Sequence, residues 1–187
     1  MNFSVENYIL SLNSVLAKID KEQIKKAISL VKDSFSKEKK IITCGNGGSA
    51  YNASHYITDW NKMTNISKKK NFFGFSLCDN IGLITAYSND INYDHVFKGQ
   101  LECILQKDDL LICISGSGNS KNVINAAEYA NSIGATTLAI VGFDGGHLIN
   151  KCKYSVHVPS FDMQICEDVH LIIGHMITKE LADFKIN

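Results

Sequence analysis

Four side chains in two predicted helices could hold a metal ion or transfer protons. His55 and Asp59 are four residues apart, so both lie on one face of a helix and can reach a common ion or substrate. Glu167 and His175 are eight residues apart, about 80° around the axis of the last helix, so both can face one site two turns long. Such a quartet can ligate zinc, or can exchange protons with a substrate without metal. Alone, however, a helical His–Asp pair is more often an ordinary surface feature, and His170 can point elsewhere and support the last helix.

Two loops rich in glycine and serine could bind a phosphate. Cys44–Ala50 follows the apolar run KIITC, and its glycines allow left-handed turns and close approach of a ligand to the start of the next helix. Ser115–Ser120 follows LLICIS and carries three hydroxyls beside exposed amides. Either loop alone could be a turn with helix-capping serines, but two of them favour a phosphate site. The candidate ligand-binding residues in these loops are Asn46, Gly47, Gly48, Ser49, Ser115, Gly116, Ser117 and Ser120.

The loops do not match the common nucleotide-binding motifs. Neither contains the Gly-Lys-Ser/Thr of a Walker motif. The first loop offers Gly45, Gly47 and Gly48, but Ala50 stands where a dinucleotide fingerprint has its third glycine. A monophosphate therefore fits these loops better than NAD or ATP.

The elements that must position these residues indicate an α/β fold. Five short runs rich in β-branched or aromatic residues (KIITC, NFFGFSL, LLICIS, TTLAIVG, YSVHV) alternate with helical stretches, as in a parallel sheet covered on both faces. We expect the main later helices at 80–88, 93–105, 119–132 and 162–184. In such a sheet, ligands bind beyond the carboxyl ends of the strands, where both loops lie.

The N-terminal part is predicted to be helical. Apolar residues recur at helical spacing from Val5 to Leu16 and from Ile24 to Phe35, and Asp20 suits the N-cap of the second helix. These helices could form a hairpin or pack on another subunit. No repeat or linker marks a second domain, so we expect one domain over residues 1–187, with residues 1–38 as a helical extension and 39–187 as a three-layer α/β/α core.

Composition excludes several classes of function. The 19 basic residues are all lysines and balance 19 acidic residues, which argues against nucleic acid as a ligand. The lysine runs at 37–40 and 68–70 are interpreted as solvated loops. No apolar segment is long enough to span a membrane, the start lacks a secretory signal, and the six cysteines, which form no Cys-x-x-Cys pair, suit reduced core thiols. We therefore expect a cytoplasmic protein.

Six segments in order, GNGGSA, SLCDN, ITAYSND, ISGSGNS, IVGFDGG and HLIIGHMITKEL, resemble the sugar isomerase (SIS) domain family and, within it, the phosphoheptose isomerase branch. The resemblance spans nearly the whole chain. It implies a five-stranded parallel sheet and an aldose–ketose isomerase. The reaction implied converts sedoheptulose 7-phosphate to D-glycero-D-manno-heptose 7-phosphate through an enediolate. It also implies a homotetramer with sites at subunit boundaries.

The resemblance further assigns roles to particular residues. Asn46, Gly47, Gly48, Asn89 and Asp90 would hold the sugar, and the second loop would hold the phosphate. The metal and catalytic positions fall on His55, Asp59, Glu167 and His175, with zinc as the metal and Asp59 or Glu167 as the base. The chain departs from the family pattern, which usually has Glu at 59, Gln at 167 and Arg at 165, where this chain has Ile165.

Two alternatives to this isomerase remain open at this point. Some members of the domain family bind a sugar phosphate or a protein partner without catalysis, and the replaced residues at positions 59 and 167 could reflect such a role. The same replacements could also suit an isomerase of a related sugar phosphate.

Overall fold

The centre of the structure is a five-stranded sheet in the order β2-β1-β3-β4-β5, with every neighbouring pair parallel. The computed structural model describes residues 4–68 and 71–183. The strands are β1 Ile41–Cys44, β2 Gly74–Ser76, β3 Leu110–Ser115, β4 Thr136–Val141 and β5 Tyr154–His157. Each lies inside one of the five apolar runs predicted as strands, so the predicted α/β class and five-stranded parallel sheet are confirmed.

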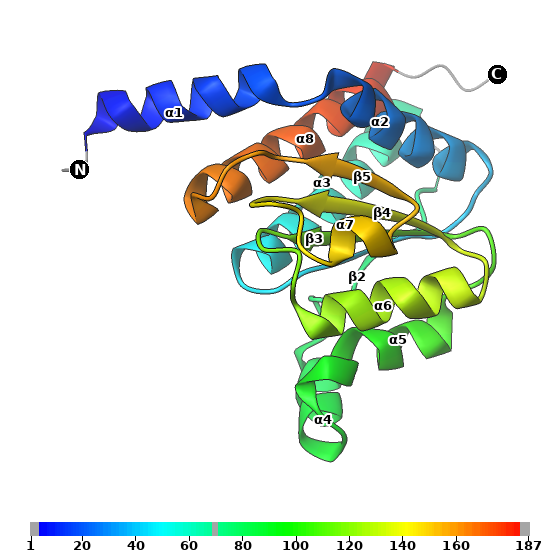
Figure 1. The fold of residues 1–187 in the computed structure, drawn as a ribbon. Helices are drawn as coiled ribbons and strands as arrows, with labels where there is room; N and C mark the ends of the chain where they lie inside the picture. The colour runs from blue at the N-terminus through cyan, green and yellow to red at the C-terminus, as the bar shows by residue number, and fades with distance from the viewer. Residues whose placement is uncertain (1–3, 69–70, 184–187) are drawn as a thin grey trace.

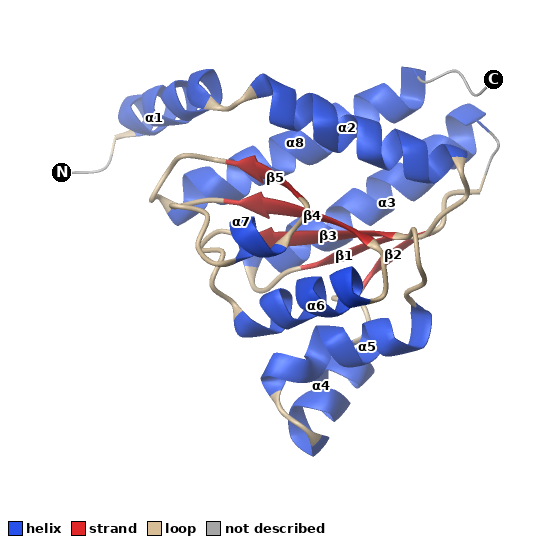
Figure 2. Cartoon of the chain, turned by 45° about the vertical axis from the view of Figure 1, so that its right-hand side comes forward, coloured by secondary structure: helices blue, strands red, loops and turns tan. Residues whose placement is uncertain are grey.

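Helices cover both faces of the sheet and complete three layers (Figure 1). They are α1 Val5–Lys18, α2 Lys21–Ser36, α3 Gly48–Lys68, α4 Ile81–Asp90, the 3₁₀ turn η1 Tyr93–His95, α5 Val96–Ile104, α6 Lys121–Ser132, α7 Leu148–Lys151 and α8 Met163–Asp183. Figure 2 shows α2, α3 and α8 on one face, α5, α6 and α7 on the other, and α4 outside α5. No helix of the described residues is long and apolar enough to cross a membrane. The predicted helix at 93–105 divides into η1 and α5, and α7 was not predicted.

Alternate residues of β1, β3 and β4 supply two separate hydrophobic cores. In β3, Ile112 and Ile114 face the core shared with α2, α3 and α8, whereas Leu111 and Cys113 face the core under α5 and α6. All four side chains are fully buried. Continuous apolar runs are typical of strands that are buried on both faces, which is why this sequence pattern identified the sheet.

The two N-terminal helices do not form a hairpin. Asp20 Oδ1 accepts a hydrogen bond of 2.8 Å from the Glu22 amide, which confirms the predicted N-cap of α2. Beyond this turn α1 runs away from α2 instead of folding back along it (Figure 1). The Tyr8 hydroxyl donates a 2.7 Å hydrogen bond to Asp168 Oδ2, so α1 is attached to the first half of α8. Of the two predicted arrangements, the hairpin is therefore wrong within this chain.

The cysteines divide between core and surface. Cys44, Cys113 and Cys166 are buried, but Cys103 is exposed on α5. The prediction of core thiols was therefore wrong for Cys103, because the inner face of that short helix is formed by neighbours such as Leu101. Burial raises the pKa of the Cys78 thiol to about 12, which keeps it protonated and a poor nucleophile at neutral pH.

Close packing of α3 on α8 depends on a glycine. A Cβ atom at Gly174 would lie 2.1 Å from Cε1 of Tyr56, a side chain that is 1% exposed. The Tyr56 hydroxyl donates to the carbonyl of His170, and Trp60 Nε1 donates to the carbonyl of Gly174 at 3.3 Å. These bonds fix the aromatic rings of α3 against α8, so neither ring can move away without losing a buried hydrogen bond.

Gly174→Ala is expected to destabilise the protein although alanine favours helices. Overpacking against Tyr56 costs about 1–3 kcal/mol of stability. The gain in helix propensity from glycine to alanine is about 1 kcal/mol, so we expect a net loss of stability. We expect the melting temperature to fall by several degrees in thermal unfolding. Gly82→Ala, in exposed α4, is the matched control, since its Cβ would meet only Asn80 Oδ1 at 3.2 Å. An equal or higher melting temperature for Gly174→Ala than for Gly82→Ala would contradict this account.

Candidate active site

The two predicted ligand loops meet in one cavity. They follow β1 and β3, which are neighbours in the sheet, so both loops lie at the same edge. The cavity has a volume of about 290 Å³. It is lined by all eight predicted loop residues, Asn46, Gly47, Gly48, Ser49, Ser115, Gly116, Ser117 and Ser120, and by Met163 and Glu167 of α8. The structure thus brings the predicted phosphate loops together.

Glycines allow α8 to approach these loops. A Cβ atom at Gly48 would lie 2.3 Å from the carboxyl group of Glu167, and one at Gly116 would lie 2.3 Å from Met163 Sδ. Gly47 has a φ of +55°, in the left-handed region that favours glycine. Glu167 therefore extends over the start of α3 and forms part of the cavity wall.

The second loop is held from inside by its own serines. Ser115 Oγ accepts a 3.0 Å hydrogen bond from the Gly118 amide, and Ser117 Oγ accepts one of 3.2 Å from the Asn119 amide. These bonds leave the hydroxyl protons of both serines available for donation to an anion. Among the residues that the structure describes, no lysine lines the cavity, so the donors that this wall offers to a phosphate are amides and hydroxyls.

A third loop, residues 142–147 between β4 and α7, supports the second loop from outside. The Leu148 amide donates to the Gly118 carbonyl at 2.9 Å, and the His147 amide donates to Asn119 Oδ1 at 3.1 Å. Gly118 has a φ of +67°, and a Cβ atom there would lie 2.1 Å from the Gly145 carbonyl oxygen. The loop after β4 and the first residue of α7 therefore fix the shape of the second loop.

Three of the four predicted metal-binding side chains converge. Nε2 of His55 lies 3.1 Å from Nε2 of His175, and Asp59 Oδ2 lies 3.4 Å from the first and 3.8 Å from the second. Two ligand atoms bound tetrahedrally to one zinc ion are separated by about 3.3 Å, given zinc–ligand bonds of about 2.0–2.1 Å. The spacing of this triad therefore fits a zinc ion, with neutral imidazoles and a carboxylate as suitable donors.

The fourth predicted ligand, Glu167, stands apart from the triad. Within the described part of the chain, the metal-competent cluster comprises His55, Asp59 and His175 only. Glu167 precedes His175 by eight residues, which is about 12 Å along a helix, and its side chain lines the cavity. The predicted quartet is therefore divided between the cavity and the triad.

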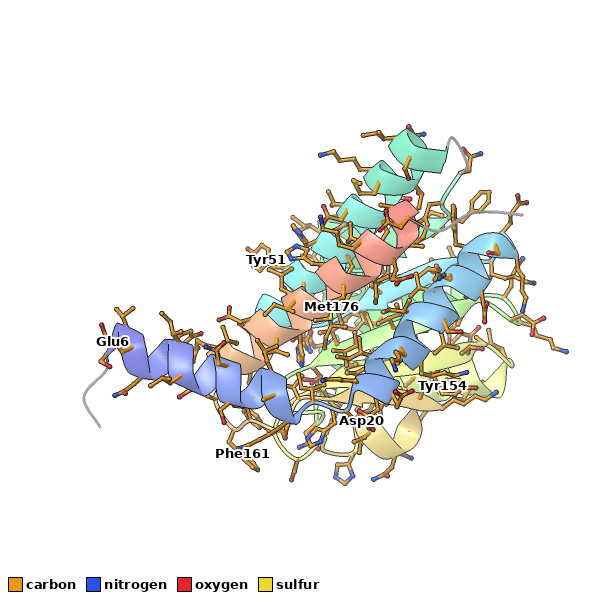
Figure 3. The ribbon with its side chains drawn as sticks, turned by 90° about the horizontal axis from the view of Figure 1, so that it is seen from above. Glu6, Asp20, Tyr51, Tyr154, Phe161 and Met176 are labelled. Atoms are coloured by element: carbon orange, nitrogen blue, oxygen red, sulfur yellow. The ribbon has the colours of Figure 1, made fainter. Side chains whose placement is uncertain are left out.

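The triad lies on the open side of the α3–α8 pair. Figure 3 shows these helices side by side, with Tyr51 on the outer side of α3 and Met176 on α8. Tyr51 is 81% exposed and Met176 is 40% exposed. The side chains of His55 and His175 are themselves about half exposed, at 45% and 50%. A small ligand can therefore reach the triad from solvent.

Asn89 and Asp90 lie elsewhere in this chain. They occupy the exposed last turn of α4, where Asn89 Nδ2 donates to Asp90 Oδ1 at 2.9 Å. Neither residue lines the cavity. The sugar-binding role predicted for them from the family resemblance therefore has no counterpart within a single chain.

Two side chains that the sequence did not single out fix Asn46 in the cavity wall. Asn122, in the first turn of α6, exchanges two hydrogen bonds with Asn46, and the Tyr93 hydroxyl donates to Asn46 Oδ1 at 2.8 Å. A sequence signal existed for Asn122, because it is a polar residue next to the apolar Val123 on the first turn after the second loop. Tyr93 offered no comparable signal.

His170 is a buried histidine near the end of β4. Its side chain is 0% exposed, and neither ring nitrogen has a hydrogen-bond partner of ordinary geometry among the described residues. Burial lowers the pKa of His170 to about 4, and the backbone of Val141 partly opposes this shift. The ring is therefore neutral at pH 7.

This pKa predicts acid sensitivity. Because the folded pKa lies below the ordinary value of 6.5, the unfolded chain takes up the proton first as the pH falls. The stability loss begins near pH 6.5 and is complete below pH 4; by pH 5 it reaches about 2 kcal/mol. Urea unfolding at pH 8 and pH 5 should show this loss in the wild type and in a variant at exposed His147, His147→Leu, but not in His170→Leu. An equal loss in all three proteins would exclude His170 as the cause.

Comparison with known proteins identifies the family. The SIS domain model matches residues 6–142. The phosphoheptose isomerase of Aliarcobacter butzleri is 36% identical over 156 residues, which is 83% of this chain and 82% of that protein. The phosphoheptose isomerase of Clostridium acetobutylicum is 34% identical over 170 residues, 89% of this chain and 86% of that protein.

The structural comparison agrees. The structure of phosphoheptose isomerase GmhA from Neisseria gonorrhoeae matches with a TM-score of 0.88 and 27% identity, over 96% of this chain and 97% of that chain. The predicted resemblance is therefore confirmed. This chain belongs to the SIS domain family and, within it, to the phosphoheptose isomerases.

Proposed function

We propose that this protein is an aldose–ketose isomerase that converts sedoheptulose 7-phosphate to D-glycero-D-manno-heptose 7-phosphate. The names of its relatives support the reaction class and the substrate. The cavity supports a sugar phosphate, because it offers hydroxyl and amide donors from two loops at the carboxyl edge of a parallel sheet. We assign the phosphate to Ser115, Gly116, Ser117 and Ser120, and the sugar to Asn46, Gly47, Gly48 and Ser49.

The observation that carries this proposal is the spacing between the cavity and the triad along α3. Gly48 lines the cavity and His55 belongs to the triad. Seven residues of helix advance about 10 Å and complete almost two turns, so both positions lie on one side of α3. An extended chain of single bonds advances about 1.25 Å per bond, so eight bonds from C1 to phosphorus of an open-chain heptose 7-phosphate span about 10 Å. A phosphate in the cavity would therefore place the carbonyl end at the triad.

The proposed mechanism transfers a proton between adjacent carbons through an enediolate. Asp59 removes the proton beside the carbonyl group, and His175 transfers a proton at the other reacting atom. The contacts of Asp59 with the two imidazoles use Oδ2, so we assign the transferred proton to Oδ1. Glu167 lines the cavity, and we assign it to sugar hydroxyls.

We further propose zinc as the ion held by His55, Asp59 and His175, with Glu167 as an additional ligand only if its side chain turns toward them. When bound, zinc supplies Lewis-acid stabilisation of the negative charge on the enediolate oxygens.

Elemental analysis of zinc-treated, desalted protein should give about one zinc per chain for the wild type and much less for His55→Ala. His147→Ala, which changes an exposed histidine outside the triad, is the control. Equal zinc content in all three proteins would contradict the proposed metal site.

The decisive test of function is proton exchange. The pure protein is incubated with sedoheptulose 7-phosphate in deuterated water, and deuterium at C2 is followed by NMR. An enediolate intermediate predicts deuterium incorporation together with formation of the aldose. No exchange, either with or without added zinc, would exclude isomerase activity and favour a noncatalytic sugar-phosphate-binding role; exchange with a different sugar phosphate only would identify a related isomerase.

We also propose that residues 1–187 act as one SIS domain, with the α-helical extension 1–38 on the 39–187 core, within a cytoplasmic homotetramer. Val5, Ile9 and Leu10 of α1 are each more than half exposed, which supports burial of this helix against another subunit. Sites at subunit boundaries would bring Asn89 and Asp90 of one chain to the cavity of another. Light scattering of the eluting protein should give four times the chain mass of 20.7 kDa, and a monomer would contradict the assembly.

A further inference from the structure

The side chain of Asn46 is held by three hydrogen bonds that come from distant parts of the chain. Asn46 Nδ2 donates to Asn122 Oδ1 at 2.9 Å, and Asn122 Nδ2 donates back to Asn46 Oδ1 at 3.0 Å. The Tyr93 hydroxyl donates to the same Asn46 Oδ1 at 2.8 Å. Asn122 is 2% exposed, so its half of the pair is protected from water. The network joins the first loop, η1 and the start of α6.

A backbone amide determines which way the two amides face. Asn122 Oδ1 also accepts a 3.0 Å hydrogen bond from the Val123 amide, which can only donate. The same amide also donates to the Ser120 carbonyl at 3.1 Å, but a reversed Asn122 side chain would place its NH₂ group against this N–H. Asn122 Oδ1 therefore stays beside the Val123 amide, and Asn122 Nδ2 is the atom that faces Asn46 Oδ1. Asn46 must then present its oxygen to Asn122 Nδ2 and its nitrogen to Asn122 Oδ1. The orientation of the cavity residue is thus set by a main-chain group in another helix.

This arrangement leaves Asn46 with one kind of group for a ligand. An amide oxygen accepts two hydrogen bonds, and both are supplied by Asn122 and Tyr93. The Nδ2 group has two protons, of which one binds Asn122. The remaining proton is the group that Asn46, a residue of the cavity wall, can offer to a ligand. A ligand atom beside it must therefore be a hydrogen-bond acceptor.

We infer that Asn122 and Tyr93 are positioning residues that hold Asn46 as a hydrogen-bond donor to the substrate. The inference rests on the proposed function, which assigns Asn46 to the sugar phosphate. It adds a chemical requirement: the substrate atom at Asn46 is a carbonyl, hydroxyl or phosphate oxygen that accepts a hydrogen bond. It also couples the two ligand loops, because the partner of Asn46 lies two residues beyond Ser120.

Asn122→Asp is the sharpest test, since the carboxylate keeps the size of the side chain and can still accept from Val123. It cannot donate to Asn46 Oδ1, so two oxygens would face each other and Asn46 would turn. We expect KM for sedoheptulose 7-phosphate to rise about tenfold or more, with kcat changed by less than about twofold. Tyr93→Phe removes one of the two donors to Asn46 Oδ1 and should raise KM by a smaller factor. Asn131→Asp is the matched control, because Asn131 lies in the last turn of the same helix and donates to the Lys151 carbonyl, with no bond to η1 or the first loop.

A double-mutant cycle shows whether Asn122 acts through Asn46. In the Asn46→Ala background, Asn122→Asp should change KM by less than about twofold. An equal rise in KM in both backgrounds, or no rise in the wild-type background, would overturn the inference. Tyr93→Phe in the same two backgrounds gives the same distinction if Asn122→Asp does not fold.

A spectroscopic readout separates this inference from the proposed function. The side-chain amide signals of Asn46 are identified by their loss in Asn46→Ala, and we expect them to move in Asn122→Asp and Tyr93→Phe but not in Asn131→Asp. Unmoved Asn46 signals would overturn the inference even if the protein is an isomerase. If the signals move but the wild type shows no deuterium exchange, the positioning is supported and the proposed reaction is excluded.

Discussion

Asp59→Asn is expected to reduce the rate of deuterium incorporation into sedoheptulose 7-phosphate by about 10²–10⁴-fold, the usual contribution of a general acid or base. Asparagine has the same shape as aspartate but cannot accept the proton. The change should lower kcat more than it raises KM, because the proposed role of Asp59 is at the reacting carbons, and Asp59 does not line the cavity proposed for the phosphate. The measurement is the initial exchange rate at saturating substrate with zinc supplied.

Glu167→Gln is the matched variant for the second carboxylate. Glu167 lines the cavity and lies about two helical turns from His175, so we expect its replacement to alter KM with a much smaller effect on kcat. A loss of exchange in Glu167→Gln that equals or exceeds the loss in Asp59→Asn would indicate that Glu167, and not Asp59, is the general base. The zinc content of both variants must be measured alongside, since loss of the ion would otherwise imitate loss of the base.

Gly118→Ala is expected to have the second large effect, on phosphate binding. Gly118 combines a left-handed φ of +67° with a potential Cβ contact of 2.1 Å to the Gly145 carbonyl oxygen. Backbone atoms cannot move aside as a side chain can, so the second loop must shift away from the loop after β4. We expect KM to rise by at least tenfold, with inhibition by inorganic phosphate weakened in parallel, and stability to fall by about 1–3 kcal/mol.

Gly134→Ala is the control that distinguishes the effect of left-handed backbone strain from the effect of a displaced second loop. Gly134 has a φ of +81°, but its Cβ would meet only the flexible Lys107 side chain, at 3.3 Å or more, and it lies at the far end of α6 from the cavity. This variant should lose stability through the same left-handed strain and keep its KM. If Gly134→Ala weakened phosphate inhibition as much as Gly118→Ala does, the contact between the two loops would not explain the effect.

Local sequence patterns predicted the parts of the site that local structure determines. The loops at 46–49 and 115–120 could be found because a strand, a glycine-rich turn and a helix follow one another within a few residues. The pairing of His55 with Asp59 followed from the helical period. The contribution of His175 to the same cluster required α8 to pack on α3, and the sheet order that makes this possible is not encoded in any single segment.

Contacts between distant segments explain what the sequence did not predict. Glu167 and His175 share a helix, but the position of α8 along α3 places one at the cavity and the other at the triad. Asn89 and Asp90 were assigned from family resemblance alone, and within one chain α4 carries them away from the cavity. Tyr93 and Asn122 are 47 and 76 residues from Asn46 in sequence, so no periodicity could reveal their bonds to it.

The position of the triad on α3 limits how this enzyme could evolve toward sugars of other lengths. Inserting one residue between Gly48 and His55 would rotate the imidazole by about 100° while advancing it by only about 1.5 Å. His55 would then no longer face His175 on α8, although the distance between the cavity and the triad would have grown by little more than one carbon–carbon bond. Only an insertion of a full helical turn, about 5.4 Å long, would turn His55 back toward His175. With the substrate placed as we propose, adaptation to hexose or octose phosphates is expected to proceed through the loops, because the distance along α3 from Gly48 to His55 is fixed by the helix.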